Sequence, residues 1–221
     1  MNFSFSEVEE ALAVTYDIDE SKRLAFRARL QHLQKLKFPA GLNTGRGRAA
    51  TYTVGHIYLL AVALELLQLG LSPDRAKRVI EEDLHSVAMA GSMVARSGAP
   101  ESRRFTAPMF LYCDPAALRE LTKIYQDEDW ASQTFFYGGM GAVTESFKEW
   151  FIEGVQRMAF FSVSALVFDL ARCMLPKTKS MAVFYEGLAE WADPFIHNVN
   201  YPLDRHDQPY WYTIEMKIGD T

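Results

Sequence analysis

Six basic side chains lie close together in the first quarter of the chain, in a pattern that suits binding to a polyanion. Four are expected in a helix and two in a glycine-rich segment: Lys22, Arg23, Arg27, Arg29, Arg46 and Arg48. Arginine matches the paired acceptors of guanine, and lysine attracts phosphate. The four helical side chains follow one another at spacings of one, four and two residues, so we expect them along one side of the helix.

The charge of the chain is distributed unevenly. The 221 residues carry a net charge of −5, yet residues 20–50 contain eight basic side chains and one acidic side chain, Glu20. Residues 81–221 contain 12 basic and 20 acidic side chains. A short basic block on an acidic chain is typical of a protein that docks one face on nucleic acid. A solvated basic helix is the alternative interpretation.

Other function classes find little support in the sequence. No apolar run approaches the roughly 20 residues that span a bilayer, so no membrane association is expected. Residues 1–7 lack the basic and apolar regions of a signal peptide, and Cys113 and Cys173 have no metal-binding or redox spacing. We therefore expect a cytoplasmic protein without cofactor or metal. No nucleotide-binding, hydrolase or zinc-protease motif occurs, so no enzyme is predicted.

The elements that must position the basic residues can be read from capping and periodicity. Residues 5–14 are predicted to form a short helix. A capping box at Asp17 and Glu20 predicts that a second, basic helix begins near residues 18–20 and ends before Pro39. Its expected buried stripe is Leu24, Leu30, Leu33 and Leu36. Residues 41–48 are expected to form a tight turn between two short strands.

A third helix is predicted over residues 54–69, capped by Thr53 and ended by Gly70. Ser72 and Pro73 then begin a fourth helix that is expected to reach about Ala90. Residues 91–104 have the composition of a linker. Beyond it we expect strands at 105–113, 129–141 and 160–164, and helices at 115–126, 142–157, 165–175 and 181–192.

The order of the N-terminal elements resembles the DNA-binding domain of the bacterial MerR family of regulators. The resemblance covers about 80 residues and rests on Phe5–Val8, Lys35–Phe38, Tyr52–His56 and Leu64–Pro73. It implies a winged helix-turn-helix in which Tyr52 closes the wing. The predicted fold is thus mostly α: a winged-helix domain at 1–90, a linker at 91–104, and a small α/β dimerisation or effector domain at 105–221.

The sequence therefore predicts a transcriptional regulator that binds specific sequences of double-stranded DNA. The expected DNA-binding residues are Lys22, Arg23, Arg27, Arg29, His32, Arg46, Arg48 and Tyr52. We expect a nucleoid-associated homodimer that reads half-sites about one helical turn apart, with RNA polymerase or another regulator as a further partner. Two alternatives stay open. One is an adaptor whose basic helix docks an acidic protein, and the other is an enzyme in residues 105–221.

Overall fold

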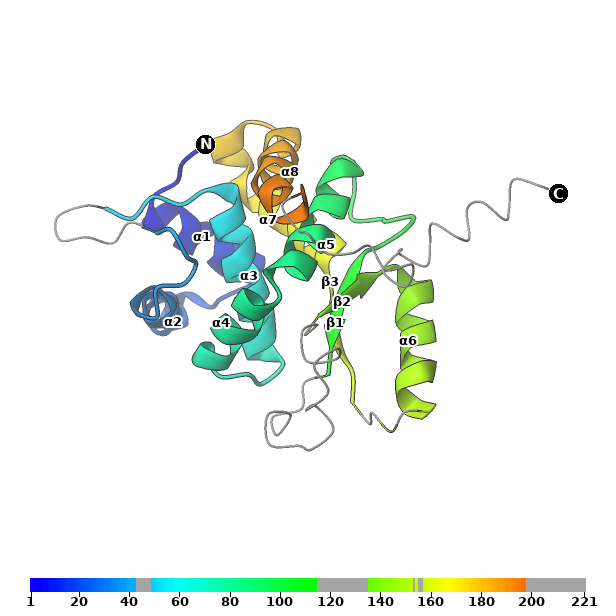
Figure 1. Ribbon diagram of the computed structural model, residues 1–221. Coiled ribbons are helices and arrows are strands. Elements are labelled where there is room, and N and C mark those ends of the chain that lie inside the picture. The colour runs from blue at the N-terminus through cyan, green and yellow to red at the C-terminus, as the bar shows by residue number, and fades with distance from the viewer. Residues whose placement is uncertain (43–48, 115–134, 153, 155–156, 198–221) are drawn as a thin grey trace.

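The computed structural model describes residues 1–42, 49–114, 135–152, 154 and 157–197. These residues form a mostly helical body and one small antiparallel sheet (Figure 1). The first half holds α1 (Phe5–Thr15), a 3₁₀ turn (Glu20–Lys22), α2 (Arg23–Lys35), α3 (Val54–Gln68), α4 (Pro73–Glu82) and α5 (Leu84–Arg96). The second half holds β1 (Phe110–Cys113), β2 (Phe136–Gly138), α6 (Met140–Ile152), β3 (Ala159–Ser162), α7 (Val163–Thr178) and α8 (Met181–His197). The mostly helical class is confirmed.

Two predicted elements fall outside the described residues. They are the tip of the predicted hairpin, at residues 43–48, and the helix predicted at 115–126. Before the first gap, residues 36–42 contain no strand. After it, Tyr52 pairs with Phe3 through two backbone hydrogen bonds of 2.8 Å. Among the described residues, the segment that follows the predicted hairpin therefore pairs with the N-terminal segment.

Helix α1 is fixed at its first turn by a capping box. The Ser4 hydroxyl accepts a hydrogen bond from the Glu7 backbone N–H, and the Ser4 N–H donates to the Glu7 carboxylate at 2.8 Å. Lys177, near the end of α7, forms an ion pair of 2.7 Å with the same carboxylate. The lysine and Ser4 together lower the pKa of Glu7 to about 2. This cap joins the start of α1 to the end of α7.

Helix α3 lies at the centre of the body, and its boundaries follow the sequence signals. Thr53 caps its first turn, and Gly70 follows its end with a φ of +95°. Glycine reaches this left-handed conformation at little cost. Ser72 and Pro73 then begin α4 as predicted. Because α3 is apolar on almost every side, most of its side chains are buried.

The helix predicted from Pro73 to Ala90 is divided in two. The helix is interrupted at Asp83, which ends α4 and caps α5. Helix α5 then continues through Gly91 to Arg96, so the first residues of the predicted linker are helical. A Cβ atom at Gly91 would lie 2.9 Å from the ring of Tyr58, whose hydroxyl donates to the Val87 carbonyl at 3.0 Å. Gly91 is therefore a close-packing position between α5 and α3, and not a break.

Helix α8 packs against α5, α7 and α3. A Cβ atom at Gly55 would lie 2.1 Å from Cγ of Trp191, and one at Gly187 would lie 3.0 Å from Val54. The missing side chains let the two helix backbones approach closely. The Trp191 ring fills the space over Gly55 and contacts the ring of Tyr58 at a centroid distance of 5.8 Å.

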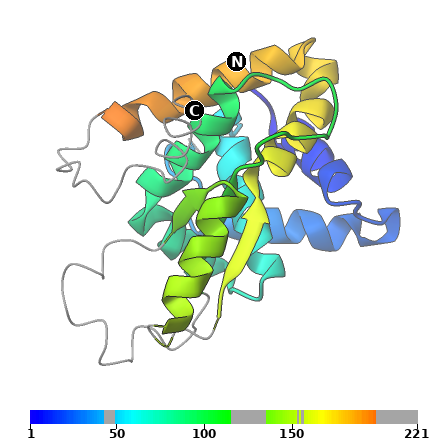
Figure 2. The same ribbon diagram turned by 90° about the vertical axis from the view of Figure 1, so that its right-hand side faces the viewer.

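The sheet has the strand order β2-β1-β3, and both pairings are antiparallel. Side chains alternate between its faces. Phe110 and Tyr112 pack against Trp150 of α6, while Leu111 and Cys113 join the core beneath α5 and α7. Figure 2 shows α6 in front of the sheet and the other helices behind it. The sheet is therefore the middle of three layers.

A single hydrophobic core extends across the predicted domain boundary. It includes Leu12, Ile57 and Val87 from the N-terminal half together with Leu111 and Leu188 from the C-terminal half. Residues 91–104 therefore do not separate two cores. Within the described residues, none of the helices has the length and apolar character needed to cross a membrane.

Candidate nucleic-acid interface

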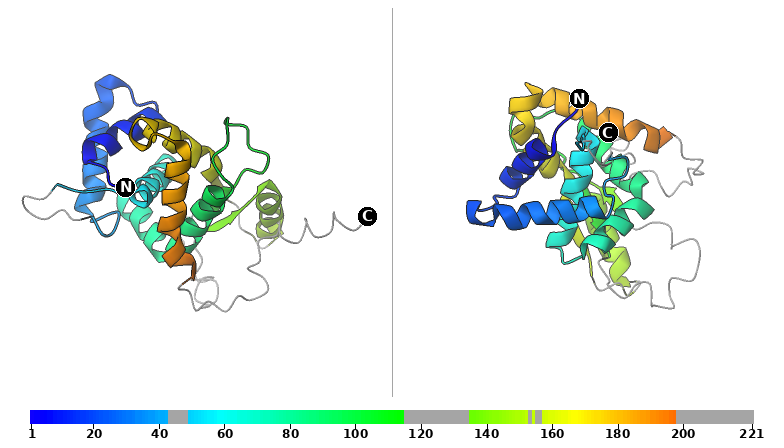
Figure 3. Two further views of the ribbon diagram at one scale, coloured as in Figure 1. Left: turned by 90° about the horizontal axis from the view of Figure 1, so that it is seen from above. Right: turned by 90° about the vertical axis from the view of Figure 1, so that its left-hand side faces the viewer.

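Helix α2 carries most of the predicted DNA-binding residues and lies on the outside of the helical body. Figure 1 and the left panel of Figure 3 place it at the opposite end of the molecule from α6. Asp19 caps the turn before it by accepting a hydrogen bond from the Ser21 N–H at 2.8 Å. Four residues, Tyr16–Asp19, separate α1 from this turn. The whole connection from α1 to α2 is therefore seven residues, Tyr16–Lys22, of which the last three form the turn.

The buried side of α2 differs from the predicted leucine stripe. Phe26, Leu30 and Leu33 are buried, whereas Leu24 is 81% exposed and Leu36 is half-buried. Successive residues in a helix are rotated by about 100°, so Leu24 lies about 160° from Phe26. The aromatic side chain at position 26 decides which side faces the core. The expectation that Leu24 is buried is wrong.

Two of the predicted DNA-binding arginines are turned toward α1. Arg23 forms an ion pair with Glu10, and Arg27 forms one of 3.3 Å with Glu9, a residue that is only 8% exposed. The Arg27 guanidinium also lies over the Phe5 ring at 5.6 Å. Exposed pairs and cation–π contacts of this kind contribute about 0.5–1 kcal/mol each. Arg23 and Arg27 thus help to hold α2 against α1.

The remaining basic residues of α2 face solvent. Lys22, Arg29, His32 and Lys35 are all exposed, and no ion pair joins Lys22, Arg29 or Lys35 to another described residue. Arg29 is about 160° around the helix from Arg27. The expectation that Lys22, Arg23, Arg27 and Arg29 share one side is therefore wrong. Arg29 lies on the flank away from α1 and Lys35 near the centre of the outward face, so the available positive charge does not form one row.

Tyr52 lies in the interior of the protein. Its side chain is fully buried, and its hydroxyl accepts a hydrogen bond from the side-chain amide of Gln34 in α2. Burial raises the pKa of the Tyr52 hydroxyl. In this arrangement Tyr52 joins α2 to the N-terminal segment from inside and presents no atom at the surface. Arg46 and Arg48 belong to residues 43–48, outside the described part of the chain.

His56 lies at the base of the predicted hairpin. Its Nδ1 accepts a hydrogen bond of 3.1 Å from the Thr53 backbone N–H, and its other ring nitrogen faces Gly41. Burial lowers the pKa of His56. The neutral ring can accept this hydrogen bond, whereas a ring protonated at Nδ1 cannot. His56 therefore helps to fix the chain on both sides of residues 43–48.

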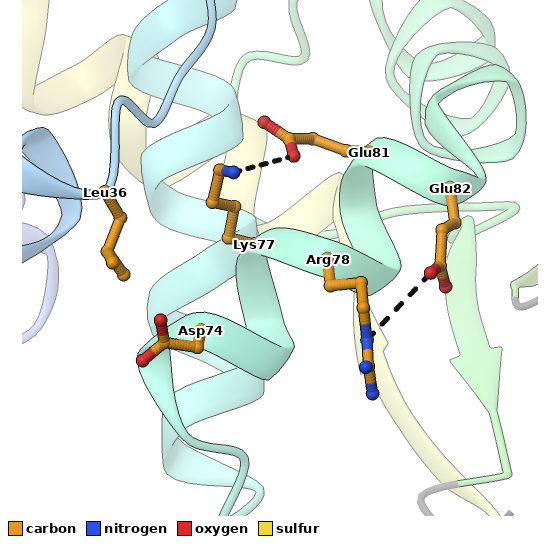
Figure 4. Close-up of a pocket in the computed structure, with 6 residues that line it drawn as sticks. All are labelled: Leu36, Asp74, Lys77, Arg78, Glu81 and Glu82. Carbon is orange, nitrogen blue, oxygen red and sulfur yellow. Dashed lines mark ion pairs between the residues drawn. The ribbon is translucent and has the colours of Figure 1, made fainter. Parts of the chain in front are cut away.

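A hollow between the end of α2 and α4 is the other surface feature beside this helix (Figure 4). It is lined by Leu36, Asp74, Lys77, Arg78, Glu81 and Glu82. Lys77 pairs with Glu81 at 3.1 Å, and Arg78 pairs with Glu82 at 3.9 Å (Figure 4). Because both cations already face carboxylates one helical turn away, the hollow is a mixed-charge surface and a poor site for an anion.

Two features of this interface were not predicted from the sequence. Lys35 was not among the predicted contacts, although α2 contains no acidic residue over Arg23–Lys35. That acid-free run is the signal that identifies the whole exposed face as basic. The pairing of Arg23 and Arg27 depends on adjacent carboxylates in α1, which spacing within α2 does not reveal.

The described residues contain no group of three or more His, Cys, Asp or Glu side chains arranged to hold a metal ion. Comparison with known proteins finds no match to any family model, curated protein or solved structure. The resemblance to the MerR family accordingly stays a prediction from the residues.

Proposed function

We propose that this chain is a regulator that binds double-stranded DNA by placing α2 in the major groove. The observation that carries the proposal is the exposed side of α2, which over Arg23–Lys35 has no acidic residue and bears Arg29 and Lys35 free of ion pairs with other described residues. A major groove about 12 Å wide admits one α-helix. In helix-turn-helix proteins the second helix enters the groove while the first crosses the backbone.

The pairing between α1 and α2 supports this assignment. A helix that reads DNA must be held rigidly, because a small displacement misplaces its contacts. Arg23 and Arg27 fix one flank of α2 through Glu10 and Glu9, and Phe26 and Leu30 fix its base. The exposed cations Arg29 and Lys35 are then left to contact phosphates beside the groove.

Replacing Arg29 and Lys35 together by alanine is expected to weaken binding to duplex DNA about tenfold. Each lost phosphate contact should lower the slope of log affinity against log salt by about 0.9. Fluorescence anisotropy at several salt concentrations measures both effects. The matched control is Arg103→Ala with Arg104→Ala, which removes two exposed cations from the segment between α5 and β1 and should leave both quantities unchanged.

Two results would contradict the proposal. One is the absence of duplex binding by the unaltered chain at about 50 mM salt, where non-specific contacts alone should register. The other is an equal loss of affinity in the control variant, which would locate the binding charge elsewhere. Nuclease-resistant capture of an acidic protein, without duplex binding, would instead favour the adaptor function, in which the exposed Leu24 docks on that partner.

We further propose that the regulator acts as a dimer joined through the outward side of α6. Phe147, Phe151 and Ile152 are 53%, 69% and 86% exposed, and the Phe147 and Phe151 rings contact each other at 6.2 Å. Met140, also exposed, continues the same stripe at a spacing of seven residues from Phe147. Because α2 and α6 lie at opposite ends of the molecule (Figure 3, left), such a dimer would place its two α2 helices on the sides away from the dimer contact.

The double variant Phe147→Ser with Phe151→Ser is expected to convert a dimer into a monomer, because it removes the apolar area that a second copy would cover. Light scattering coupled to size-exclusion chromatography measures the mass over a range of concentrations. Val14→Ser, which alters an exposed apolar side chain on α1, should leave the dimer intact. A wild-type mass of one chain at every concentration would rule out the dimer.

A further inference from the structure

The row of side chains on α2 that points farthest from the core, called here the outermost stripe, differs in composition from the flanks of the helix. Leu24, Ala28, Gln31 and Lys35 are all exposed and follow one another at spacings of four, three and four residues. In a helix these positions lie within about 60° of one another. They face directly away from the buried stripe of Phe26, Leu30 and Leu33. These four side chains would therefore be the first to meet the floor of a groove that α2 enters.

This stripe contains no arginine. Arg23 and Arg27 are turned toward the carboxylates of α1, and Arg29 lies on the opposite flank. Bidentate contact between arginine and guanine is the commonest means of reading a G·C pair in the major groove. The central positions of α2 lack the side chain that this contact needs.

The side chains that the stripe does present match an A·T pair. The C5-methyl group of thymine is read by apolar contact, and adenine is read by the paired donor and acceptor of a side-chain amide. Leu24 and Ala28 are the apolar members of the stripe, and Gln31 is the amide. Leu24 is 81% exposed, so its side chain is free to make such a contact.

From this arrangement, and resting on the DNA binding proposed above, we infer that α2 reads A·T base pairs in the major groove. Leu24 and Ala28 contact thymine methyl groups, and Gln31 contacts adenine. Lys22 and Arg29 contact phosphates on one side of the groove, and Lys35, at the C-terminal end of the stripe, contacts a phosphate where α2 leaves the groove. The charge of the face favours DNA over an apolar protein groove, because α2 presents Arg29 and Lys35 and contains no acidic residue.

The first test is selection from a pool of random duplexes with the full chain, followed by anisotropy on the recovered duplex. We expect enrichment of A·T pairs in the recovered sites. Replacing thymine by uracil in that duplex removes only the C5-methyl groups and should weaken binding roughly tenfold. A recovered site rich in G·C pairs, or equal affinity for the thymine and uracil duplexes, would overturn the inference.

Variants assign the contacts to individual side chains. Leu24→Ala should lose part of the preference for the thymine duplex over the uracil duplex, because Ala28 keeps its contact, and Gln31→Ala should lose roughly tenfold of the preference for adenine. Because both positions are exposed, these changes leave the core intact. Val14→Ala on α1 is the control and should keep the wild-type preference.

The outcomes separate this inference from the proposed function. Salt-dependent binding without preference for thymine over uracil overturns base reading by Leu24 and Ala28 and leaves DNA binding in place. Absence of duplex binding overturns both. A Leu24→Ala variant that discriminates thymine from uracil as well as the wild type does would exclude Leu24 from the contact.

Discussion

Replacing Gly55 by alanine is expected to lower the free energy of unfolding by about 3 kcal/mol. The added Cβ would lie 2.1 Å from Cγ and 2.2 Å from Cδ1 of Trp191, and Cγ is the atom through which the indole ring is attached. The ring cannot turn away freely, because it contacts Tyr58 at 5.8 Å and Phe195 at 5.3 Å. The contact between α3 and α8 must therefore open. Urea unfolding followed by circular dichroism measures the loss.

Gly141 provides the matched control, because it is a helical glycine with nothing within 4 Å of the added Cβ. Gly141→Ala should be neutral or should stabilise by up to about 1 kcal/mol, since alanine favours the helix. In a Trp191→Ala background the cost of Gly55→Ala should fall sharply, which would show that the two positions are coupled. A Gly55→Ala variant as stable as the wild type would mean that α8 does not pack closely on α3.

The parts of the fold that could be predicted are those fixed by neighbouring residues. Thr53 caps α3 because its hydroxyl accepts a hydrogen bond from the backbone N–H of His56, three residues later, and Gly70 follows the end of the helix with a positive φ. Such signals lie entirely within a few residues, so the sequence reveals them. The boundaries of α1 and α3 are confirmed for this reason.

The parts that could not be predicted depend on distant partners. A small-residue segment around Gly91 has the composition of a linker, yet Tyr58 of α3 packs against it and the helix continues. The packing of Trp191 against the core depends likewise on Gly55, far away in the chain. Composition alone does not show that two such residues meet, and for this reason the expected boundary at 91–104 does not divide the core.

The candidate interface could likewise be predicted only in part. The acid-free composition of α2 was visible, and so was its placement after a short turn. The sequence does not reveal which side of α2 faces the core, because Phe26 is buried there in place of Leu24. It also does not reveal that Glu9 and Glu10 of α1 pair with Arg27 and Arg23. The orientation of a basic helix follows from its neighbours, and the arginine count does not determine which side chains are available.

Replacing Asp83 by alanine is the second change expected to have a large effect, a loss of about 2–4 kcal/mol in the free energy of unfolding. One carboxylate oxygen accepts the Ser86 N–H at 3.3 Å and so caps α5, while the other accepts the Phe135 N–H at 2.7 Å. Losing the cap costs about 1 kcal/mol. Leaving the buried N–H of Phe135 without an acceptor costs about 1–3 kcal/mol more.

The geometry of Asp83 explains why the helix divides there and why the break matters. The residue is 7% exposed, and it joins the start of α5 to the residue that precedes β2, 52 positions later. Asp83→Asn keeps one acceptor oxygen and places an N–H₂ group where the other stood, so it should lose part of this stability and not all of it. Asp74→Ala removes an exposed carboxylate from the first turn of α4 and should cost less than about 1 kcal/mol. Chemical denaturation of the three variants compares these losses. If Asp83→Ala cost no more than Asp74→Ala, the bond between α5 and the sheet would contribute nothing, and the sheet would be held by apolar packing alone.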